Sequence, residues 1–308
     1  MLIIEVANLK KVYRGTQTVE ALKGITFNVD AGEIFGILGP NGAGKTTTLS
    51  ILECLKKPTS GDVKVAGFDI KKDKKQIKKN IGVQLQSSQY PPLLTLKELL
   101  ELFASIYASK INPRETLGFV NLEDKANEVV KNLSGGQKQR FTIATSLVGN
   151  PKILFLDEPT TGLDPKARRE LWALIKQINA KGITILLTTH YMEEAEYLCD
   201  RVAIIDKGEI LTIDAPKKLI SKLSHTTQIS FFTDDKLADD FWKNISAVEK
   251  VYSNYPKIIL EINTLDSISQ VLSALRDKGV NFTGFTVKTA TLEDVYLDLT
   301  GREFNTDS

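Results

Sequence analysis

The sequence predicts an α/β fold with a parallel-sheet core, followed by a small α+β domain. A glycine-rich loop at 39–46 lies between an apolar strand run and a helical segment. Strand-like and helix-like segments then alternate over 153–187, as in a parallel sheet with crossover helices. From about residue 226 the order becomes strand, helix, strand, strand, helix, strand, which is typical of a ferredoxin-like domain.

Length and composition limit the class of protein. The 308 residues suffice for two domains, which we expect at 1–222 and 226–308. A formal net charge of +2 gives no argument for a nucleic-acid partner. Cys54 and Cys199 lack metal-ligand spacing and suit core packing in a reducing compartment. No apolar run approaches the roughly 18–20 residues that span a bilayer, so we expect a cytoplasmic protein whose membrane role needs a separate subunit.

The first third of the chain is predicted to form strands around one short helix. Residues 2–38 alternate apolar runs with turns, which predicts strands that lead into the glycine-rich loop. A helix is expected over 44–54, and short strands follow Gly61. The lysine-rich segment 71–79 is explained by a solvated helix face, with proximity to anionic lipid headgroups as the alternative.

The middle of the chain is predicted to be helical. The string Thr95-Leu96-Lys97-Glu98 has the spacing of a capping box, so a helix is expected from Thr95 toward Ser109. This helix opens a helical block at about 87–131. A further helix is expected over 165–180, and a hairpin over 202–213 closes the first domain.

The glycine-rich loop matches the phosphate-binding pattern G-x-x-x-x-G-K-[ST] and reads Gly39-Pro40-Asn41-Gly42-Ala43-Gly44-Lys45-Thr46. Glycines let the backbone curl so that successive N–H groups point at phosphate oxygens, and the helix N-terminus adds its unpaired N–H groups. Lys45 is expected to bridge the β- and γ-phosphates, and the Thr46 hydroxyl to ligate Mg²⁺. The alternative is a glycine-rich turn with a surface lysine.

A second string reads Leu133-Ser134-Gly135-Gly136-Gln137. Ser134 and Gln137 alone would form an ordinary capping box. That interpretation leaves the two glycines unexplained, because each costs about 1 kcal/mol relative to alanine in a helix. Bare backbone N–H groups at Gly135 and Gly136 could instead approach a phosphate closely.

An acidic pair, Asp157 and Glu158, follows four apolar residues. The pair therefore emerges at the carboxyl end of a strand, where open α/β sheets bind their ligands. Asp157 is expected to hold Mg²⁺ directly or through water. Two carboxylates that merely solvate a strand end are the alternative.

Together these strings resemble the ATP-binding cassette of ABC transporters, over roughly residues 1–220. The resemblance implies a P-loop NTPase fold in which a parallel-sheet core carries an antiparallel β subdomain and a helical subdomain at about 87–131. The tail through residue 308 resembles the accessory region of daunorubicin or multidrug (ABC-2 type) exporter ATPases, notably in the string at 291–297.

The resemblance also implies roles for single residues. Glu158 matches the general base that polarises the attacking water, with a pKa expected to rise in a desolvated interface. His190 matches the residue that contacts the γ-phosphate. Gln86 matches the glutamine that senses Mg²⁺ and the attacking water, with Gln84 as the alternative. Tyr13 matches the aromatic residue that stacks on adenine, with strand-surface packing as the alternative.

In the family, the second string faces the ATP of the opposite subunit, so one chain is half a site and a two-fold dimer is implied. Asp164 has a local explanation as the N-cap before Pro165, and the resemblance implies that it also crosses to the partner's site. The implied nucleotide contacts are Tyr13, Gly39, Pro40, Asn41, Gly42, Ala43, Gly44, Lys45, Thr46, Thr47, Ser134, Gly135, Gly136, Gln137 and Asp164. The implied magnesium ligands are Thr46, Gln86 and Asp157.

The function implied is ATP hydrolysis in a multi-subunit exporter, at the inner face of the membrane beneath separate integral membrane subunits. An importer ATPase is one alternative, and a soluble ABC ATPase acting on DNA or the ribosome is another. The 89 positions between Lys45 and Ser134 hold no long coiled-coil insert, and the chain has a single P-loop, which argues against the soluble class. Glu158 and His190 together argue against a cassette that cannot hydrolyse ATP.

Overall fold

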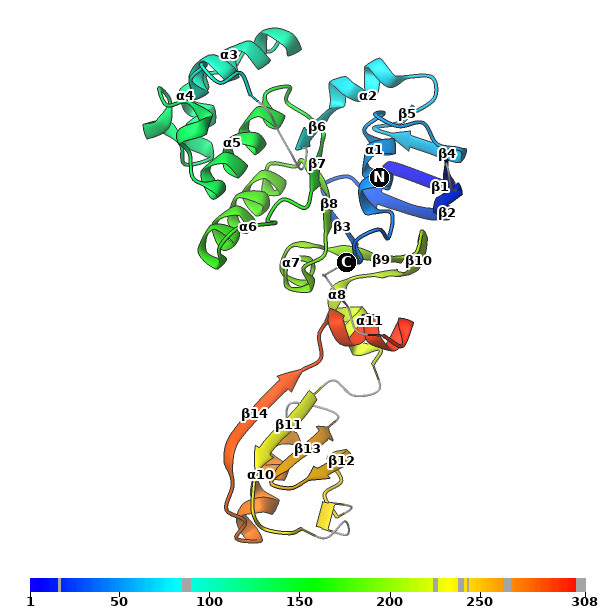
Figure 1. The fold of residues 1–308 in the computed structure, drawn as a ribbon, viewed down its shortest axis with the longest axis vertical. Helices are drawn as coiled ribbons and strands as arrows, with labels where there is room; N and C mark the ends of the chain where they lie inside the picture. Colours follow the sequence, from blue (N-terminus) through cyan, green and yellow to red (C-terminus); the bar gives the residue numbers. More distant parts are fainter. Residues whose placement is uncertain are drawn as a thin grey trace. The chain divides into compact units, whose positions relative to one another are not determined.

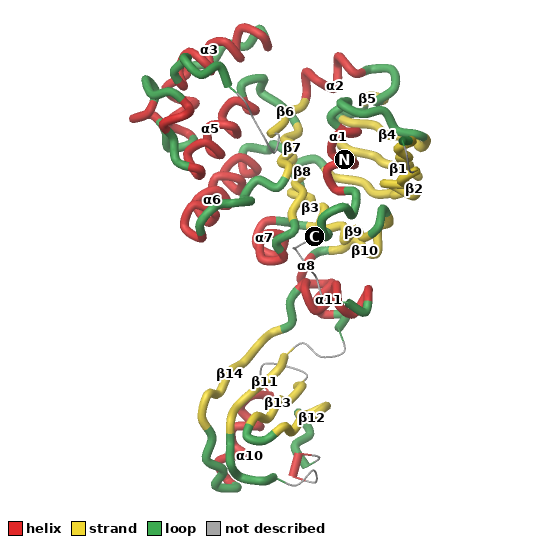
Figure 2. The backbone as a smooth tube through the Cα atoms, in the orientation of Figure 1, coloured by secondary structure: helices red, strands yellow, loops and turns green. Residues whose placement is uncertain are grey.

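The computed structural model describes residues 1–15, 18–84, 90–223, 227–237, 241–242, 244–262 and 267–302. The chain divides into two compact units, Met1–Ala215 and Pro216–Phe304, whose elements are shown in Figures 1 and 2. Gln86 lies outside the described residues. Within the described ranges, no helix combines the length and apolar character that crossing a bilayer requires.

A six-stranded sheet forms the centre of the first unit, in the order β10-β9-β3-β8-β7-β6. Its strands are β3 (Ile34–Leu38), β6 (Ile81–Gln84), β7 (Ile153–Asp157), β8 (Thr184–Thr189), β9 (Arg201–Asp206) and β10 (Glu209–Asp214). All neighbours pair in parallel except β10, which is antiparallel to β9. Every residue of β3, β7 and β8 is buried, as expected for parallel strands covered on both faces.

A second, antiparallel sheet has the order β2-β1-β4-β5. Its strands are β1 (Leu2–Arg14), β2 (Thr18–Asp30), β4 (Ser60–Val65) and β5 (Phe68–Asp69). Alternation of buried and exposed residues along these strands turns one face of the sheet inward. The two sheets share one apolar core, which includes Ile4, Leu9, Phe27, Phe35 and Phe155.

Helices complete the first unit on both faces of the central sheet. They are α1 (Lys45–Leu52), α2 (Lys74–Asn80), α3 (Leu96–Tyr107), α4 (Pro113–Phe119), α5 (Gly135–Leu147), α6 (Pro165–Ala180) and α7 (Met192–Leu198), with 3₁₀ turns at Glu123–Lys125 and Val130–Asn132. In Figure 1, α5 and α6 lie on one side of β7 and β8, and α1 with the antiparallel sheet lies on the other.

The helix starts follow from local capping chemistry. The Thr95 hydroxyl accepts from the N–H of Glu98, and the Glu98 carboxylate accepts from the N–H of Thr95, so α3 begins at the predicted capping box. Asp164 caps α6 through the N–H groups of Lys166 and Ala167. The helix expected over 44–54 is shorter, because Cys54 has a left-handed φ of 60°.

The second unit is built on a four-stranded antiparallel sheet in the order β12-β13-β11-β14. Its elements are α8 (Pro216–Ser221), β11 (Thr227–Phe232), β12 (Val248–Asn254), β13 (Lys257–Ile262), α10 (Ser267–Asp277), β14 (Thr283–Thr289) and α11 (Leu292–Thr300). β13 separates β11 from β12, and β11 separates β13 from β14, which is the split arrangement of strands. The core of this unit includes Phe231, Trp242, Leu260, Val271 and Leu275.

Candidate active site

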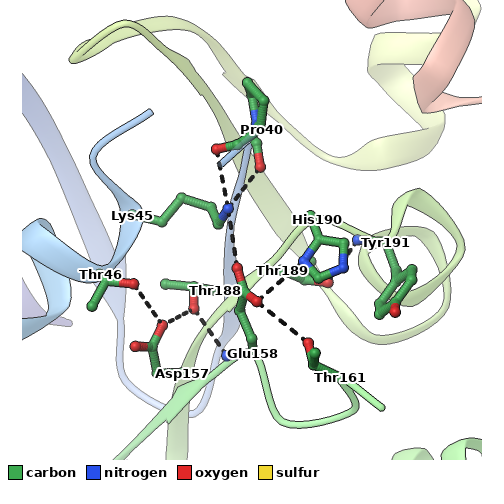
Figure 3. A network of polar contacts seen from close by, with 11 residues as sticks. Pro40, Lys45, Thr46, Asp157, Glu158, Thr161, Thr188, Thr189, His190 and Tyr191 are labelled. Atoms are coloured by element: carbon green, nitrogen blue, oxygen red, sulfur yellow. Dashed lines mark hydrogen bonds and ion pairs between the residues drawn. The ribbon is translucent and has the colours of Figure 1, made fainter. Parts of the chain in front are cut away.

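Three neighbouring strands bring the predicted site residues together. Because β8 lies between β3 and β7, the carboxyl ends of these parallel strands meet at one edge of the sheet. The loop 39–46 follows β3, Asp157 ends β7 with Glu158 next to it, and His190 directly follows β8. Figure 3 shows their side chains joined in one polar network.

The phosphate-binding loop depends on glycine at two positions. Gly44 is the N-cap of α1 with φ 108°, a left-handed conformation that side chains rarely adopt. At Gly39 a Cβ atom would lie 2.2 Å from the backbone oxygen of Ile205. Gly44 provides no side-chain cap for α1, so the N–H groups of its first turn can face an anion.

Lys45 places a buried ammonium at the centre of the site. Its Nζ atom donates to the backbone oxygens of Gly39 at 2.8 Å and Pro40 at 3.2 Å. The same atom lies 3.1 Å from Oε1 of Glu158, and the two side chains are only 4% and 10% exposed. These contacts compensate the cost of burying a charge.

Asp157 and Thr46 supply oxygen ligands of the kind that magnesium prefers. Asp157 Oδ1 accepts hydrogen bonds from the hydroxyls of Thr46, at 3.3 Å, and Thr188. Mg²⁺ is usually held by one or two carboxylates together with waters and substrate phosphates. A carboxylate and a hydroxyl beside a phosphate-binding loop therefore fit Mg²⁺.

Glu158 is held in an unusual backbone conformation between Lys45 and His190. Its φ is 47°, and its N–H donates to both Oγ1 and O of Thr188. His190 Nδ1 lies 3.2 Å from Glu158 Oε2. Contact with His190 and the charge of Lys45 outweigh burial and lower the pKa of Glu158 to about 2.

The sequence-based expectation of a raised pKa for Glu158 concerned a desolvated interface, whereas this pKa belongs to the single chain. The expectation considered desolvation, which raises the pKa of a carboxyl group. Within a single chain the contact with His190 and the charge of Lys45 dominate, so the carboxylate is ionised throughout the ordinary pH range.

Tyr13 lies in β1, and two lysines contact its ring. The ammonium groups of Lys11 and Lys56 are 4.9 Å and 5.4 Å from the ring centroid. Although burial raises the pKa of the Tyr13 hydroxyl, contacts with Thr47 and Lys56 lower it below its ordinary value.

The second string, residues 133–137, is called the signature from here on, and its residues lie outside the network of Figure 3. Ser134 Oγ accepts from the N–H of Gln137, and Gln137 Oε1 accepts from the N–H of Ser134, which forms the expected capping box of α5. Ser134, Gly135 and Asp164 are exposed. They are accessible to a second molecule.

Several residues of the site carried no sequence signal. Thr188 contacts both members of the acidic pair, but its type and position do not distinguish it from Thr189. Gln139 of α5 donates to the backbone oxygen of Pro159 at 2.6 Å and so joins the signature helix to the loop after Glu158. Glu53 is buried at the end of α1, where burial and the nearby Asp157 carboxylate raise its pKa to about 7.

Gln84, the alternative to Gln86, ends β6 and is fully buried.

The fold and this network define a P-loop nucleotide hydrolase. A family model described as ABC transporter matches residues 22–161. The linearmycin resistance ATP-binding protein LnrL of Bacillus subtilis is 35% identical, over 97% of this chain and 99% of that protein. A Nod factor export ATP-binding protein I of Burkholderia orbicola is 38% identical, over 97% of each chain.

Among solved structures, the dimeric post-hydrolysis state of the ATP-binding cassette MJ0796, bound to ADP and Pi, has a TM-score of 0.62 and 33% identity. It covers 69% of this chain, which spans 98% of the cassette. The chain therefore belongs to the ATP-binding proteins of the ABC transporter family. It is an ATPase.

Proposed function

We propose that this chain is the ATP-hydrolysing subunit of a multi-subunit exporter and that it works as a homodimer at the cytoplasmic face of the membrane. The observation that carries the proposal is an incomplete site. The P-loop, acidic pair and His190 form one network, whereas Ser134 and Asp164 are exposed and lie outside that network. A second cassette would supply the missing half from its own Ser134.

In this assignment each predicted site residue has one task. Lys45 and the loop 39–46 bind the phosphates, and Tyr13 stacks on adenine. Thr46, Asp157 and Gln86 hold Mg²⁺, which neutralises phosphate charge when bound. Glu158 orients the attacking water and accepts its proton, and His190 contacts the γ-phosphate.

Phosphate binding would draw the Lys45 ammonium away from Glu158. Without that neighbouring cation the pKa of Glu158 would rise, which suits a general base. The low pKa of Glu158 in the single chain thus describes a resting arrangement that the substrate itself disrupts.

The helical block at 87–131 is proposed as the docking face for the membrane subunit. Along α3 the apolar side chains of Leu102, Ile106 and Tyr107 are exposed, with Ile106 at 68%. An exposed apolar cluster of this kind is typical of an interaction site. Export rather than import is favoured by the string at 291–297 and by the relative named for Nod factor export.

The domain boundaries at 1–222 and 226–308 remain part of the proposal. The split strand order of the second unit supports a ferredoxin-like accessory domain.

Co-purification tests the proposed function. We expect an integral membrane protein to co-purify with the chain, and we expect Ile106→Glu and Leu102→Glu to weaken that association while ATP binding is unchanged. Leu55→Glu is the matched control, because Leu55 is exposed but lies outside the helical block. Equal association of all three variants with the membrane protein would contradict the docking proposal.

A further inference from the structure

Tyr191 directly follows His190 and has no task in the proposed site. It is the N-cap residue of α7, and its N–H donates to the hydroxyl oxygen of Thr189 at 2.9 Å. This hydrogen bond fixes the turn that carries His190. Figure 3 shows the Tyr191 ring beside the His190 imidazole, with 4.2 Å between the ring centroids and 44° between the ring planes.

The orientation of the imidazole is not set by a hydrogen bond at Nδ1. This atom lies 3.2 Å from Glu158 Oε2, but among the described residues it has no partner aligned as a hydrogen bond. Rotation of a histidine ring about its bond to Cβ has broad preferences, so contacts with neighbours must hold one orientation. The His190 side chain is only 11% exposed, and the Tyr191 ring packs against it.

The Tyr191 ring is held in turn from α6. The Arg168 guanidinium lies over this ring, 4.3 Å from its centroid. A guanidinium is attracted to the face of an aromatic ring and stacks on it. Arg168 lies one turn after Asp164, and its N–H donates to the backbone oxygen of Asp164 at 3.0 Å. These contacts therefore join the first turn of α6 to the residue that packs against the imidazole.

The position of the imidazole matters because two reacting groups meet there. His190 is proposed to contact the γ-phosphate, and Glu158 is proposed to accept the proton of the attacking water. A rotation of the imidazole would change its separation from both groups. A misplacement of about 1 Å at a reacting centre can reduce a catalytic rate about 100-fold.

We propose that Tyr191 is a positioning residue whose ring fixes the imidazole of His190 beside Glu158, and that Arg168 holds the Tyr191 ring in place. Both side chains act through His190 and not by contact with the nucleotide. The inference rests on the proposed role of His190 and extends it to two residues that had no role. If these contacts merely join α6 to α7, their loss lowers stability without a selective loss of kcat.

Substitutions at Tyr191 test the role of its ring. Tyr191→Ala removes the ring, and Tyr191→Phe keeps the ring without the hydroxyl. Tyr197→Ala is the matched control, because the Tyr197 ring also contacts an aromatic ring and a cation, Trp172 at 5.1 Å and Lys176 at 3.9 Å. For Tyr191→Ala we expect kcat to fall at least about tenfold, while KM for ATP and the affinity for ADP stay within about twofold. For Tyr191→Phe and Tyr197→Ala we expect kcat within about twofold of wild type.

A substitution at Arg168 tests the support of the ring from α6. Arg168→Met keeps a long apolar side chain and removes the cation. We expect kcat to fall about threefold at unchanged ADP affinity. Arg169→Met changes the exposed neighbour and should leave kcat unchanged. Equal kcat values for Arg168→Met and Arg169→Met would overturn the assignment of Arg168.

Nucleotide affinity and the conservative variant separate positioning from a loss of fold. If Tyr191→Ala loses ADP affinity in parallel with kcat, or if Tyr191→Phe is as slow as Tyr191→Ala, the ring does not position His190 and the proposal is overturned. A kcat for Tyr191→Ala equal to that of Tyr197→Ala would overturn it too. Should Tyr191→Ala fail to fold, Tyr191→Leu keeps apolar volume without a flat ring. A lower kcat at unchanged ADP affinity is then expected, and an unchanged kcat would overturn the proposal.

A failure of this inference is distinguishable from a failure of the proposed function. If the exporter assignment fails, the wild-type chain does not associate with a membrane protein. If the role of His190 fails, His190→Ala hydrolyses ATP as fast as wild type. If only this inference fails, His190→Ala is slow and Tyr191→Ala is not.

Discussion

Lys45 and Glu158 form an ion pair at 3.1 Å that joins the phosphate-binding loop after β3 to the acidic pair after β7. Both side chains are nearly excluded from solvent, so each compensates the charge of the other. Nucleotide phosphates carry the negative charge that would compete with Glu158 for this ammonium. In the proposed function, substrate binding and the chemistry of Glu158 would therefore be coupled through one lysine.

Replacement of Lys45 by methionine tests its assignment to phosphate binding. Hydrogen bonds to charged groups contribute about 1.5–3 kcal/mol each, so we expect Lys45→Met to weaken ATP binding at least about 100-fold. Titration with a fluorescent ATP analogue measures the affinity. Lys23→Met is the control, because it removes an exposed pair with Glu209 at 3.0 Å. An affinity of Lys45→Met similar to that of the control would contradict the assignment.

Glu53 predicts a pH dependence of stability. Its pKa is about 7 in the folded chain, against 4.5 for an ordinary glutamate. As pH rises through this window, Glu53 ionises first in the unfolded chain, which favours unfolding. The free energy of unfolding that Glu53 contributes below about pH 4.5 is therefore lost by about pH 7. A shift of this size corresponds to about 3 kcal/mol.

Glu53→Gln should therefore stabilise the protein relative to wild type at pH 8 by up to about 3 kcal/mol more than at pH 4.5. Urea unfolding of both proteins at the two pH values measures the difference. Glu209→Gln, at an exposed carboxylate, should show no such trend. An identical effect of Glu53→Gln at both pH values would show that the carboxyl group is not held neutral.

Replacing a glycine of the signature should lower ATPase activity without lowering the stability of the fold. A Cβ atom at Gly135 would have its nearest neighbour, Leu163 Cδ2, at 3.8 Å, so alanine fits without a clash. Alanine favours the helix by up to about 1 kcal/mol, so Gly135→Ala should not lower the melting temperature. We expect its ATPase rate to fall at least about tenfold, because a phosphate of the partner's nucleotide needs close approach to bare backbone.

Gly118→Ala is the matched control for this substitution. Gly118 is a helical glycine of α4 whose added Cβ would meet only Glu123 Oε2, at 3.5 Å. Its ATPase rate should equal that of wild type. If Gly135→Ala retains full activity, the glycines serve only the start of α5.

Mixing two inactive variants tests whether the site is shared between chains. Lys45→Met and Ser134→Arg should each be inactive as homodimers. In a mixed dimer, Lys45 of one chain faces Ser134 of the other, so one of the two sites is intact. An equal mixture should recover about a quarter of the wild-type sites if chains pair at random. Recovery is measured as ATPase activity, and a mixture that remains inactive would argue against a shared site.

Local chemistry made much of the fold predictable from sequence. The caps at Thr95, Ser134 and Asp164 need only residues three positions apart, and the structure has all three. The P-loop and the acidic pair were placed correctly at strand ends, because apolar runs mark buried parallel strands.

Contacts between distant segments could not be predicted in the same way. The low pKa of Glu158 in the single chain could not be predicted, because its partners, Lys45 and His190, come from other parts of the sequence. The contacts of Thr188 likewise depend on β8 lying beside β7, and strand order is not written in any single motif. Sequence reasoning therefore identified the groups of the site but not the charges that surround them.

The central claim is that two chains enclose each nucleotide, and the Glu158→Gln protein tests it most directly. Sedimentation with saturating ATP and magnesium should show a dimer, whereas ADP, or a second substitution Ser134→Arg, should leave a monomer. A Glu158→Gln protein that stays monomeric with ATP at high concentration, even beside its membrane subunits, would contradict the account.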